Sequence, residues 1–133
     1  MKLTTKSEYS LLALVFIARH QKKGYVRLAA ICEKYAIPKK YLEQILYMLK
    51  GSRYTMTKRG LSGGYRLSKP ASKITIAEIV RLMDGALAPT ESASHYFFAH
   101  TPIEQEKKIL KVMKRIRDYI ARELEHLTLA DFI

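Results

Sequence analysis

Residues 38–67 carry the strongest structural pattern of the chain, and they begin with PKKYLEQILYMLK at residues 38–50. Four aliphatic residues in it recur at i, i+3, i+4 and i+7, which places them on one stripe of a helix. These residues are Leu42, Ile45, Leu46 and Leu49. Polar and charged residues fill the other positions, so we predict an amphipathic helix with Pro38 at its first position.

A short basic hairpin is predicted immediately downstream. The segment TKRGLSGGYRL, residues 57–67, reads as two short strands around a glycine-rich tip. Glycines at such a tip permit positive φ and a close approach of another backbone. Lys58 and Arg59 precede the tip, so we expect the hairpin to present positive charge at its exposed end.

The chain before this stretch predicts two further helices. Thr5–Glu8 matches a capping box that starts the first one, which ends before Gly24. The second runs from about Leu28 to Tyr35, and residues 36–38 form a tight turn into the next helix. Two helices joined by three residues have the spacing of a helix-turn-helix, and the second of them is the candidate recognition helix. With the hairpin added, the pattern is that of a winged helix-turn-helix domain.

Downstream, the sequence predicts a fourth helix, a loop and a long terminal helix. Thr75–Glu78 is a second capping box, and the segment from Ile103 to Leu127 contains no Pro or Gly. The long helix would span roughly 36 Å, and Thr128–Asp131 has the pattern of a fresh cap. The predicted fold is mainly α with a small β-wing: a winged helix-turn-helix domain plus a long C-terminal dimerisation helix. The predicted boundaries are 1–85 for the DNA-binding domain, 86–102 for a linker or loop, and 103–133 for the dimerisation helix and tail.

Apolar residues of the long helix recur with the 4-3-4 spacing of a coiled-coil seam. The seam comprises Ile109, Met113, Ile116, Ile120, Leu124 and Leu127. Because the chain offers no obvious mate for this seam, we predict a homodimer in which a second copy covers it.

The charge of the chain is unevenly distributed. The formal net charge is +12, and residues 1–85 hold 17 Lys and Arg against 5 Asp and Glu, while residues 86–133 hold 7 of each kind. This asymmetry favours a polyanionic partner, double-stranded DNA ahead of a membrane surface. No segment is long enough to span a membrane, and the single cysteine, Cys32, excludes a disulfide framework within the chain. We therefore predict a cytoplasmic protein.

The recognition helix offers candidate DNA contacts. Lys39 and Lys40 can meet phosphates, whereas Tyr41, Glu43 and Gln44 carry groups suited to base edges. Gln can pair bidentately with adenine, and Glu can accept from the amino group of cytosine. The alternative is an ordinary solvated helix face.

The wing offers a second set of candidates. Arg59 is the best suited to enter a narrow minor groove, where negative potential concentrates. The alternative is a generic hairpin whose charges only repel other strand edges. The remaining residues of the predicted DNA-binding set are Lys6, Lys58, Ser62, Gly63 and Gly64.

Other functional classes fit the sequence less well. The four histidines lack ligand spacing, and no local context suggests a Ser-His-Asp or Cys-His arrangement. Cys32 lies with Leu28 and Tyr35 at i, i+4 and i+7, the spacing of a core residue. We predict no enzyme, no metal site and no cofactor; a basic RNA- or ribosome-associated binding module remains the alternative.

Short motifs spread over nearly the whole chain resemble those of a known family. They are MKLTTK at residues 1–6, YLEQ at 41–44, RG leading to GGYRL at 59–67, and TLAD at 128–131. The set is similar to that of the Rrf-two type of bacterial transcription regulators. This resemblance implies a homodimer with crossed C-terminal helices, bound to a palindromic operator. It also implies that Tyr41, Glu43 and Gln44 read the major groove and Arg59 the minor groove.

One departure from that family concerns its sensor. Many members hold an iron–sulfur cluster through three cysteines between the wing domain and the long helix, but residues 86–102 contain none. Glu8 lies where some members use a carboxylate ligand, and one carboxylate without thiolates cannot hold a cluster. The chain thus resembles the cluster-free branch, whose members respond to a small molecule, a protein partner or a lone cysteine. We predict a repressor with a small-molecule or protein effector. Tyr96, Phe97 and Phe98 would line an effector pocket or form the dimer core.

Overall fold

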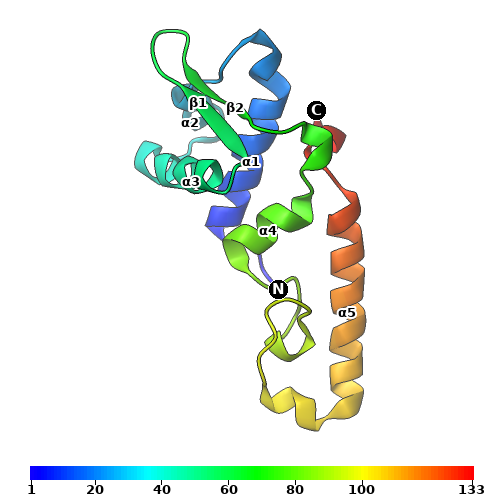
Figure 1. The fold of residues 1–133 in the computed structure, drawn as a ribbon. Helices are drawn as coiled ribbons and strands as arrows, with labels where there is room; N and C mark the ends of the chain where they lie inside the picture. Colours follow the sequence, from blue (N-terminus) through cyan, green and yellow to red (C-terminus); the bar gives the residue numbers. More distant parts are fainter.

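Five α-helices and one two-stranded hairpin make up the chain in the computed structural model, which describes residues 1–133 (Figure 1). The elements are α1 (Thr5–His20), α2 (Leu28–Tyr35), α3 (Lys39–Gly51), β1 (Thr55–Lys58), β2 (Gly64–Leu67), α4 (Ile76–Asp84) and α5 (Lys107–His126). The first four helices and the hairpin pack together, and α5 runs alongside α4 and beyond it (Figure 1). These elements confirm the predicted winged helix-turn-helix architecture. No helix combines the length and apolar character that crossing a bilayer requires.

The start of α1 differs from the prediction. Thr4, not Thr5, is the N-cap, and its hydroxyl accepts a hydrogen bond from the Ser7 N–H at 3.2 Å. The carboxylate of Glu8 is exposed and makes no hydrogen bond, so the predicted Thr5–Glu8 capping box is wrong. The physical reason lies far away in the chain, because Asp84 at the end of α4 accepts from the N–H of Thr4 at 3.1 Å. That contact holds Thr4 in the extended conformation of a cap.

Two other helix starts also shift. Pro38 is the N-cap of α3, one residue before the first helical position. The long C-terminal helix begins at Lys107 and not at Ile103, because Pro102–Gln105 form a separate 3-10 turn and Glu106 has ψ 86°. The 20 residues of α5 therefore span roughly 30 Å, shorter than predicted.

The hairpin is antiparallel, and glycines allow it to close against its neighbours. Thr55 pairs with Leu67 and Lys58 with Gly64. Gly64 has φ +143°, and a Cβ there would lie 2.4 Å from the carbonyl oxygen of Val26. A Cβ at Gly63 would lie 2.1 Å from the carbonyl oxygen of Lys58. Only glycine at these two positions therefore lets the tip fold back and lets β2 reach Val26.

The core lies between the apolar stripes of the packed helices, and the C-terminal turn completes it. Leu14, Leu46 and Ile79, from α1, α3 and α4, are fully buried. Leu129 is also fully buried, and its N–H donates to the carbonyl of Ile74 at 3.0 Å. The chain end thus returns to the core formed by the first four helices (Figure 1), as the predicted cap at Thr128–Asp131 implies.

The capping box of α4 forms as predicted and includes a third residue. The carboxylate of Glu78 accepts from the Thr75 N–H at 2.8 Å and from the Tyr54 hydroxyl at 2.7 Å. Burial alone would raise the pKa of Glu78, but the hydrogen bonds from Thr75 and Tyr54 lower it below its usual value. Burial, together with this carboxylate, raises the pKa of Tyr54 to about 12.

This arrangement predicts a pH-dependent contribution to stability. Glu78→Ala is expected to lower the free energy of unfolding by about 1–2 kcal/mol at neutral pH, because a helix cap and a half-buried hydrogen-bond acceptor are lost. Because the pKa of Glu78 is lower in the folded state, its contribution to stability is fully present above the pKa that it has in the unfolded chain. This contribution disappears as the pH falls through the pKa that Glu78 has in the folded protein. Urea unfolding at neutral and acid pH measures both effects.

The matched control is Glu33→Ala, since Glu33 is an exposed residue of α2 whose carboxylate makes no hydrogen bond. It should leave stability nearly unchanged. An effect of Glu78→Ala that does not shrink at acid pH would contradict the prediction.

Candidate nucleic-acid interface

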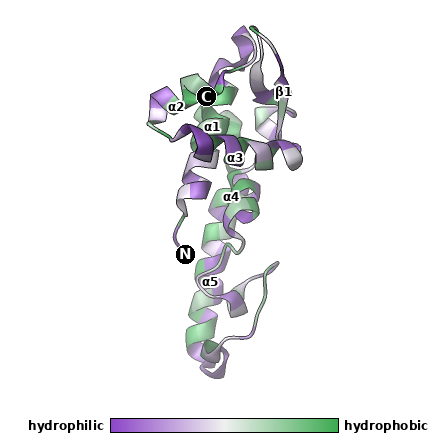
Figure 2. Ribbon diagram, turned by 90° about the vertical axis from the view of Figure 1, so that its left-hand side faces the viewer, coloured by the Kyte–Doolittle hydropathy of each residue, from purple (hydrophilic) through white to green (hydrophobic).

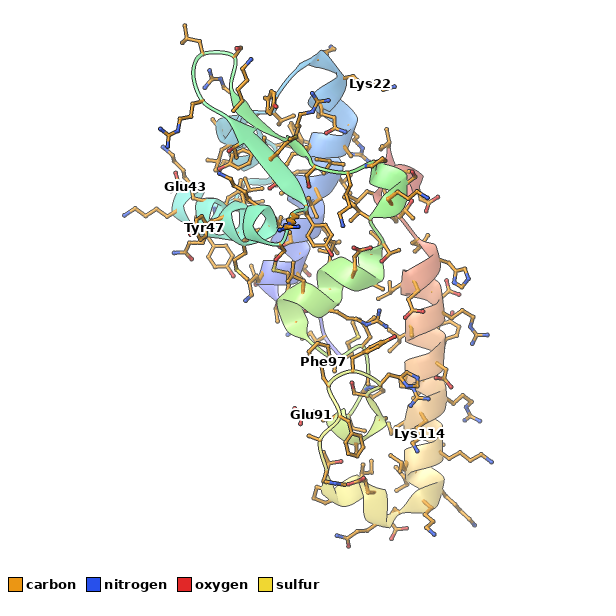
Figure 3. The ribbon with its side chains drawn as sticks, viewed as in Figure 1. Lys22, Glu43, Tyr47, Glu91, Phe97 and Lys114 are labelled. Atoms are coloured by element: carbon orange, nitrogen blue, oxygen red, sulfur yellow. The ribbon has the colours of Figure 1, made fainter.

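The outer face of α3 is open and polar, as predicted. Lys39, Lys40, Glu43 and Gln44 are exposed, whereas the aliphatic stripe of the helix is buried. Figure 3 shows Glu43 and Tyr47 on the side of α3 that faces away from α1. The helix therefore presents a row of hydrogen-bonding side chains to solvent while its other face anchors it.

The orientation of α3 is fixed by its neighbours in the fold. Ala36 adopts a left-handed conformation with φ 54°, and Ile37 is buried in the core, which sets the angle of the turn between α2 and α3. Tyr41 packs edge-to-face on Tyr9 of α1, with ring centroids 5.5 Å apart. Lys6 is half-buried on α1, about one turn before Tyr9. The N-terminal part of α1 and the first turn of α3 thus lie against each other.

The wing presents its cations and its tip to solvent. Lys58, Arg59 and Ser62 are exposed. Gly63 is buried and Gly64 is half-buried, so these two predicted residues have only their backbone to offer a ligand.

A cleft joins the two parts of this surface. It has a volume of about 420 Å³, and Lys39 and Glu43 of α3 line it together with Gly64 and Tyr65 of the wing. Burial, assisted by the carboxylate of Glu43, raises the pKa of the Tyr65 hydroxyl. The recognition helix and the wing are therefore neighbours across one concavity.

Sequence reasoning missed two residues at this surface, Tyr25 and Arg27. The guanidinium of Arg27 lines the same cleft and donates hydrogen bonds to the carbonyls of Gly60 and Leu61 at the wing tip. The ring of Tyr25 lies beneath the ammonium of Lys58 at 5.9 Å. No local pattern could reveal these contacts, because they join residues more than 30 positions apart in the chain.

The predicted seam of α5 divides along the length of the helix. Ile120, Leu124 and Leu127 are partly buried and pack on the core of their own chain, so the expectation that the whole seam lacks a mate is wrong for these three. Met113 is half-buried as well. Along α5, hydrophilic and hydrophobic residues alternate, as Figure 2 shows. The apolar residues left exposed are Ile109 (46%), Val112 (38%), Ile116 (39%) and Tyr119 (60%).

The exposed stripe keeps a spacing of three and four residues over three turns of α5. The exposed seam residues Ile109 and Ile116 lie in the N-terminal half of α5, whereas the last three seam residues lie toward its C-terminal end, which packs on the core. The free apolar face is therefore shorter than the predicted seam, and it also includes Val112 and Tyr119, which the sequence pattern did not select.

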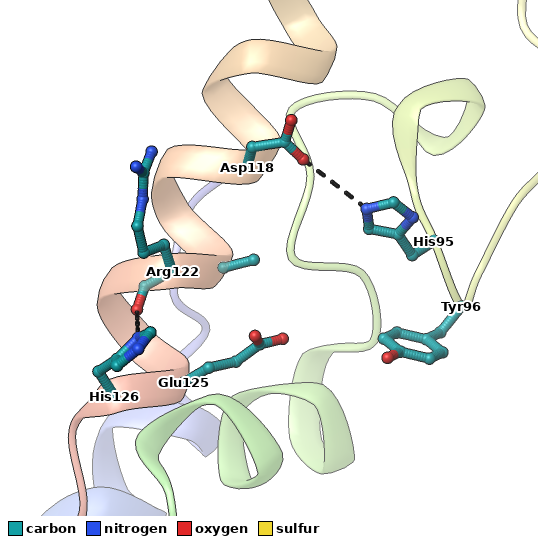
Figure 4. A pocket seen from close by; sticks show the side chains of 7 residues that line it. His95, Tyr96, Asp118, Arg122, Glu125 and His126 are labelled. Carbon is teal, nitrogen blue, oxygen red and sulfur yellow. Dashed lines mark hydrogen bonds and ion pairs between the residues drawn. The ribbon is translucent and has the colours of Figure 1, made fainter.

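Residues 86–102 form an irregular segment with one 3-10 turn at Glu91–Ala93. The segment is tied to α5, since Arg117 donates to the Ala93 carbonyl at 2.9 Å and the His95 ring lies 3.7 Å from the Asp118 carboxylate. Tyr96 stacks under the guanidinium of Arg81 at 4.9 Å. His95 and Tyr96 border an open polar cleft of about 540 Å³ against α5 (Figure 4).

The side chains of this chain do not fit an iron–sulfur cluster. Such clusters need several thiolate ligands, and Cys32 is the only cysteine. Cys32 is partly buried against the core, and burial raises the pKa of its thiol, as expected of a structural cysteine. No three His, Cys, Asp or Glu side chains come together in a way that could hold a metal ion.

A helix-turn-helix with an open polar face on α3, followed by a wing that carries exposed cations, defines the class of winged helix-turn-helix proteins. A family model described as "Rrf2: Iron-dependent Transcriptional regulator" matches residues 3–133. The chain therefore belongs to the Rrf2 family of DNA-binding transcription regulators.

Individual relatives agree with this assignment. The chain is 30% identical to an HTH-type transcriptional regulator of Synechocystis over 98% of this chain and 86% of that protein. It is 38% identical to IscR of Photorhabdus laumondii over 68% of this chain but only 55% of that protein. The solved structure of CymR, the global cysteine regulator of Bacillus subtilis, superposes with a TM-score of 0.78 at 29% identity and covers 98% of this chain and 95% of that chain.

Proposed function

We propose that the protein is a homodimeric repressor that binds a palindromic operator without an iron–sulfur cluster. The observation that carries the proposal is the exposed polar face of α3 beside the cationic wing, with one cleft between them. A helix of this kind fits the major groove, and a basic hairpin fits the adjacent minor groove or the phosphate backbone.

Within this proposal each side chain has a distinct task. Tyr41, Glu43 and Gln44 contact base edges, and Arg59 enters the minor groove, where the negative potential is strongest. Phosphate and sugar contacts position the protein without reading sequence. The residues proposed for these contacts are Lys6, Lys39, Lys40, Lys58 and Ser62, together with the backbone of Gly63 and Gly64.

The exposed apolar stripe of α5 supports the proposed homodimer. Its occupant is the same stripe of a second copy, because Ile109, Val112, Ile116 and Tyr119 form a self-complementary surface between charged flanks. Met113 lies at the border of the stripe. In this arrangement residues 1–85 bind DNA and residues 103–133 form the dimer, and residues 86–102 connect these two parts. A dimer with two α3 helices matches two half-sites one helical turn, about 34 Å, or a multiple of it apart.

The lack of a fitting ligand set supports a regulator that responds to something other than a cluster. A small molecule or a partner protein is the proposed effector, and the cytoplasm is the proposed location, where a single unpaired cysteine stays reduced. The charge asymmetry is shared with an RNA-binding module, so DNA and RNA must be distinguished by experiment.

Sequencing the genomic fragments that the full-length protein retains would test the regulator function. We expect the fragments to share one inverted-repeat motif upstream of a small number of genes. Retention of fragments without a common motif, or preferential retention of cellular RNA, would contradict the proposal.

A further inference from the structure

Residues Tyr25–Arg27, which we call the strap, connect the end of the first helical region to α2 and pass beside the hairpin (Figure 1). Val26 pairs with Tyr65 of β2 through two backbone hydrogen bonds of 2.7 Å. The ring of Tyr25 lies 5.5 Å from the guanidinium of Arg66. The strap therefore holds the wing along its length, from its paired strands toward its tip.

Arg27 continues this hold to the tip itself. Its Nη2 donates to the carbonyl of Gly60 at 3.3 Å and also to the carbonyl of Leu61. Arg27 is the only side chain that donates a hydrogen bond to residues 59–63. These two acceptors lie one and two positions after Arg59.

The tip has few other restraints. The strand pairing ends at Lys58 and Gly64, and Leu61 is 97% exposed, so side-chain packing does not hold the residues between them. Gly60, with φ +101°, accepts a backbone hydrogen bond from Gly63 at 3.1 Å, which closes the turn locally. The angle of this turn relative to α2 and α3 depends on the strap.

We infer that Arg27 is a positioning residue, which fixes the wing tip in the orientation from which Arg59 reaches the minor groove. The inference rests on the proposed function, in which Arg59 contacts DNA. A tip that is held in place before binding loses less conformational freedom when the complex forms, and this raises affinity. Arg27 thereby acts through Arg59 and not through a base contact of its own.

A double-mutant cycle tests this dependence. We expect Arg27→Ala and Arg59→Ala each to weaken binding to a selected duplex. The loss of affinity in the double variant should be smaller than the product of the two single losses by about fivefold or more. Lys23→Ala is the matched control, because Lys23 is an exposed cation just before the strap whose side chain makes no hydrogen bond or ion pair. In the double variant of Lys23 and Arg59, the loss of affinity should equal the product of the two single losses.

Amide hydrogen exchange of the free protein gives a second readout. Exchange at the Gly63 N–H should become faster in Arg27→Ala, with unchanged helix content, and should stay slow in Lys23→Ala. Effects that multiply in the cycle, or unchanged exchange at Gly63, would overturn the inference. An Arg59→Ala variant that binds as tightly as the wild type would instead contradict the proposed minor-groove contact, and the exchange rate would still report whether Arg27 holds the tip.

Discussion

Ile116→Asp is expected to convert the protein from dimers to monomers and to weaken binding to the full operator by about 10²–10⁴-fold. Ile116 lies in the middle of the exposed apolar stripe of α5 and is 39% exposed in the single chain. A carboxylate there costs the folded protomer little, but in the proposed interface it would be buried without a partner. A monomer carries only one α3 helix, so the gain from binding two half-sites together is lost.

Sedimentation and DNA titration measure the two consequences separately. Lys114→Asp is the matched control, because it introduces the same carboxylate on another face of the same helix, at an exposed position. That variant should remain dimeric. A dimer that persists in Ile116→Asp at micromolar concentration would contradict the assignment of the apolar stripe to the dimer interface.

Gln44→Ala is expected to weaken binding to the cognate duplex by about 1–3 kcal/mol and to relax the preference at particular base pairs. The Gln44 side chain is exposed on α3, and its amide can donate to and accept from one adenine edge at the same time. Its removal takes away that pairing but no charge. Binding measured over a set of single-base variants of the duplex should show the loss concentrated at one or two positions.

Lys40→Ala provides the contrasting result on the same helix. An exposed lysine that contacts phosphate contributes equally to the binding of every sequence, so binding to all duplexes should weaken alike. The slope of the logarithm of the binding constant against the logarithm of the salt concentration should become shallower by about one unit. If Gln44→Ala also weakened all duplexes uniformly, Gln44 would not be a base-reading residue. An unchanged salt slope in Lys40→Ala would remove its proposed phosphate contact.

The features that were predicted correctly from the sequence depend on neighbours close in the chain. The aliphatic stripe of α3, the bounds of α2 and the capping box at Thr75–Glu78 follow from spacings of three and four residues. The hairpin follows from its glycines, whose extra freedom the close contact of Gly64 with Val26 requires. In each case the local pattern and the final packing favour the same structure.

The features that were missed depend on contacts between distant residues. The cap at Thr4 is held by Asp84, and the contact of Arg27 with the wing tip joins residues on separate elements. Spacing alone could not show which residues of the α5 seam pack on their own chain and which stay exposed. Only the packed structure shows that Ile120 and Leu124 cover the core of their own chain. The same limit applies to the cleft beside His95, which forms when residues 86–102 fold back on α5.

Two copies of α3 and the wing are proposed to read an inverted repeat in double-stranded DNA. Selection by the full-length protein from random duplex DNA, in the presence of structured RNA as competitor, tests this proposal most directly. We expect an inverted repeat with half-site centres about 34 Å, or a multiple of it, apart. Recovery of a single unrepeated site, or binding to the RNA in preference to every duplex, would contradict it.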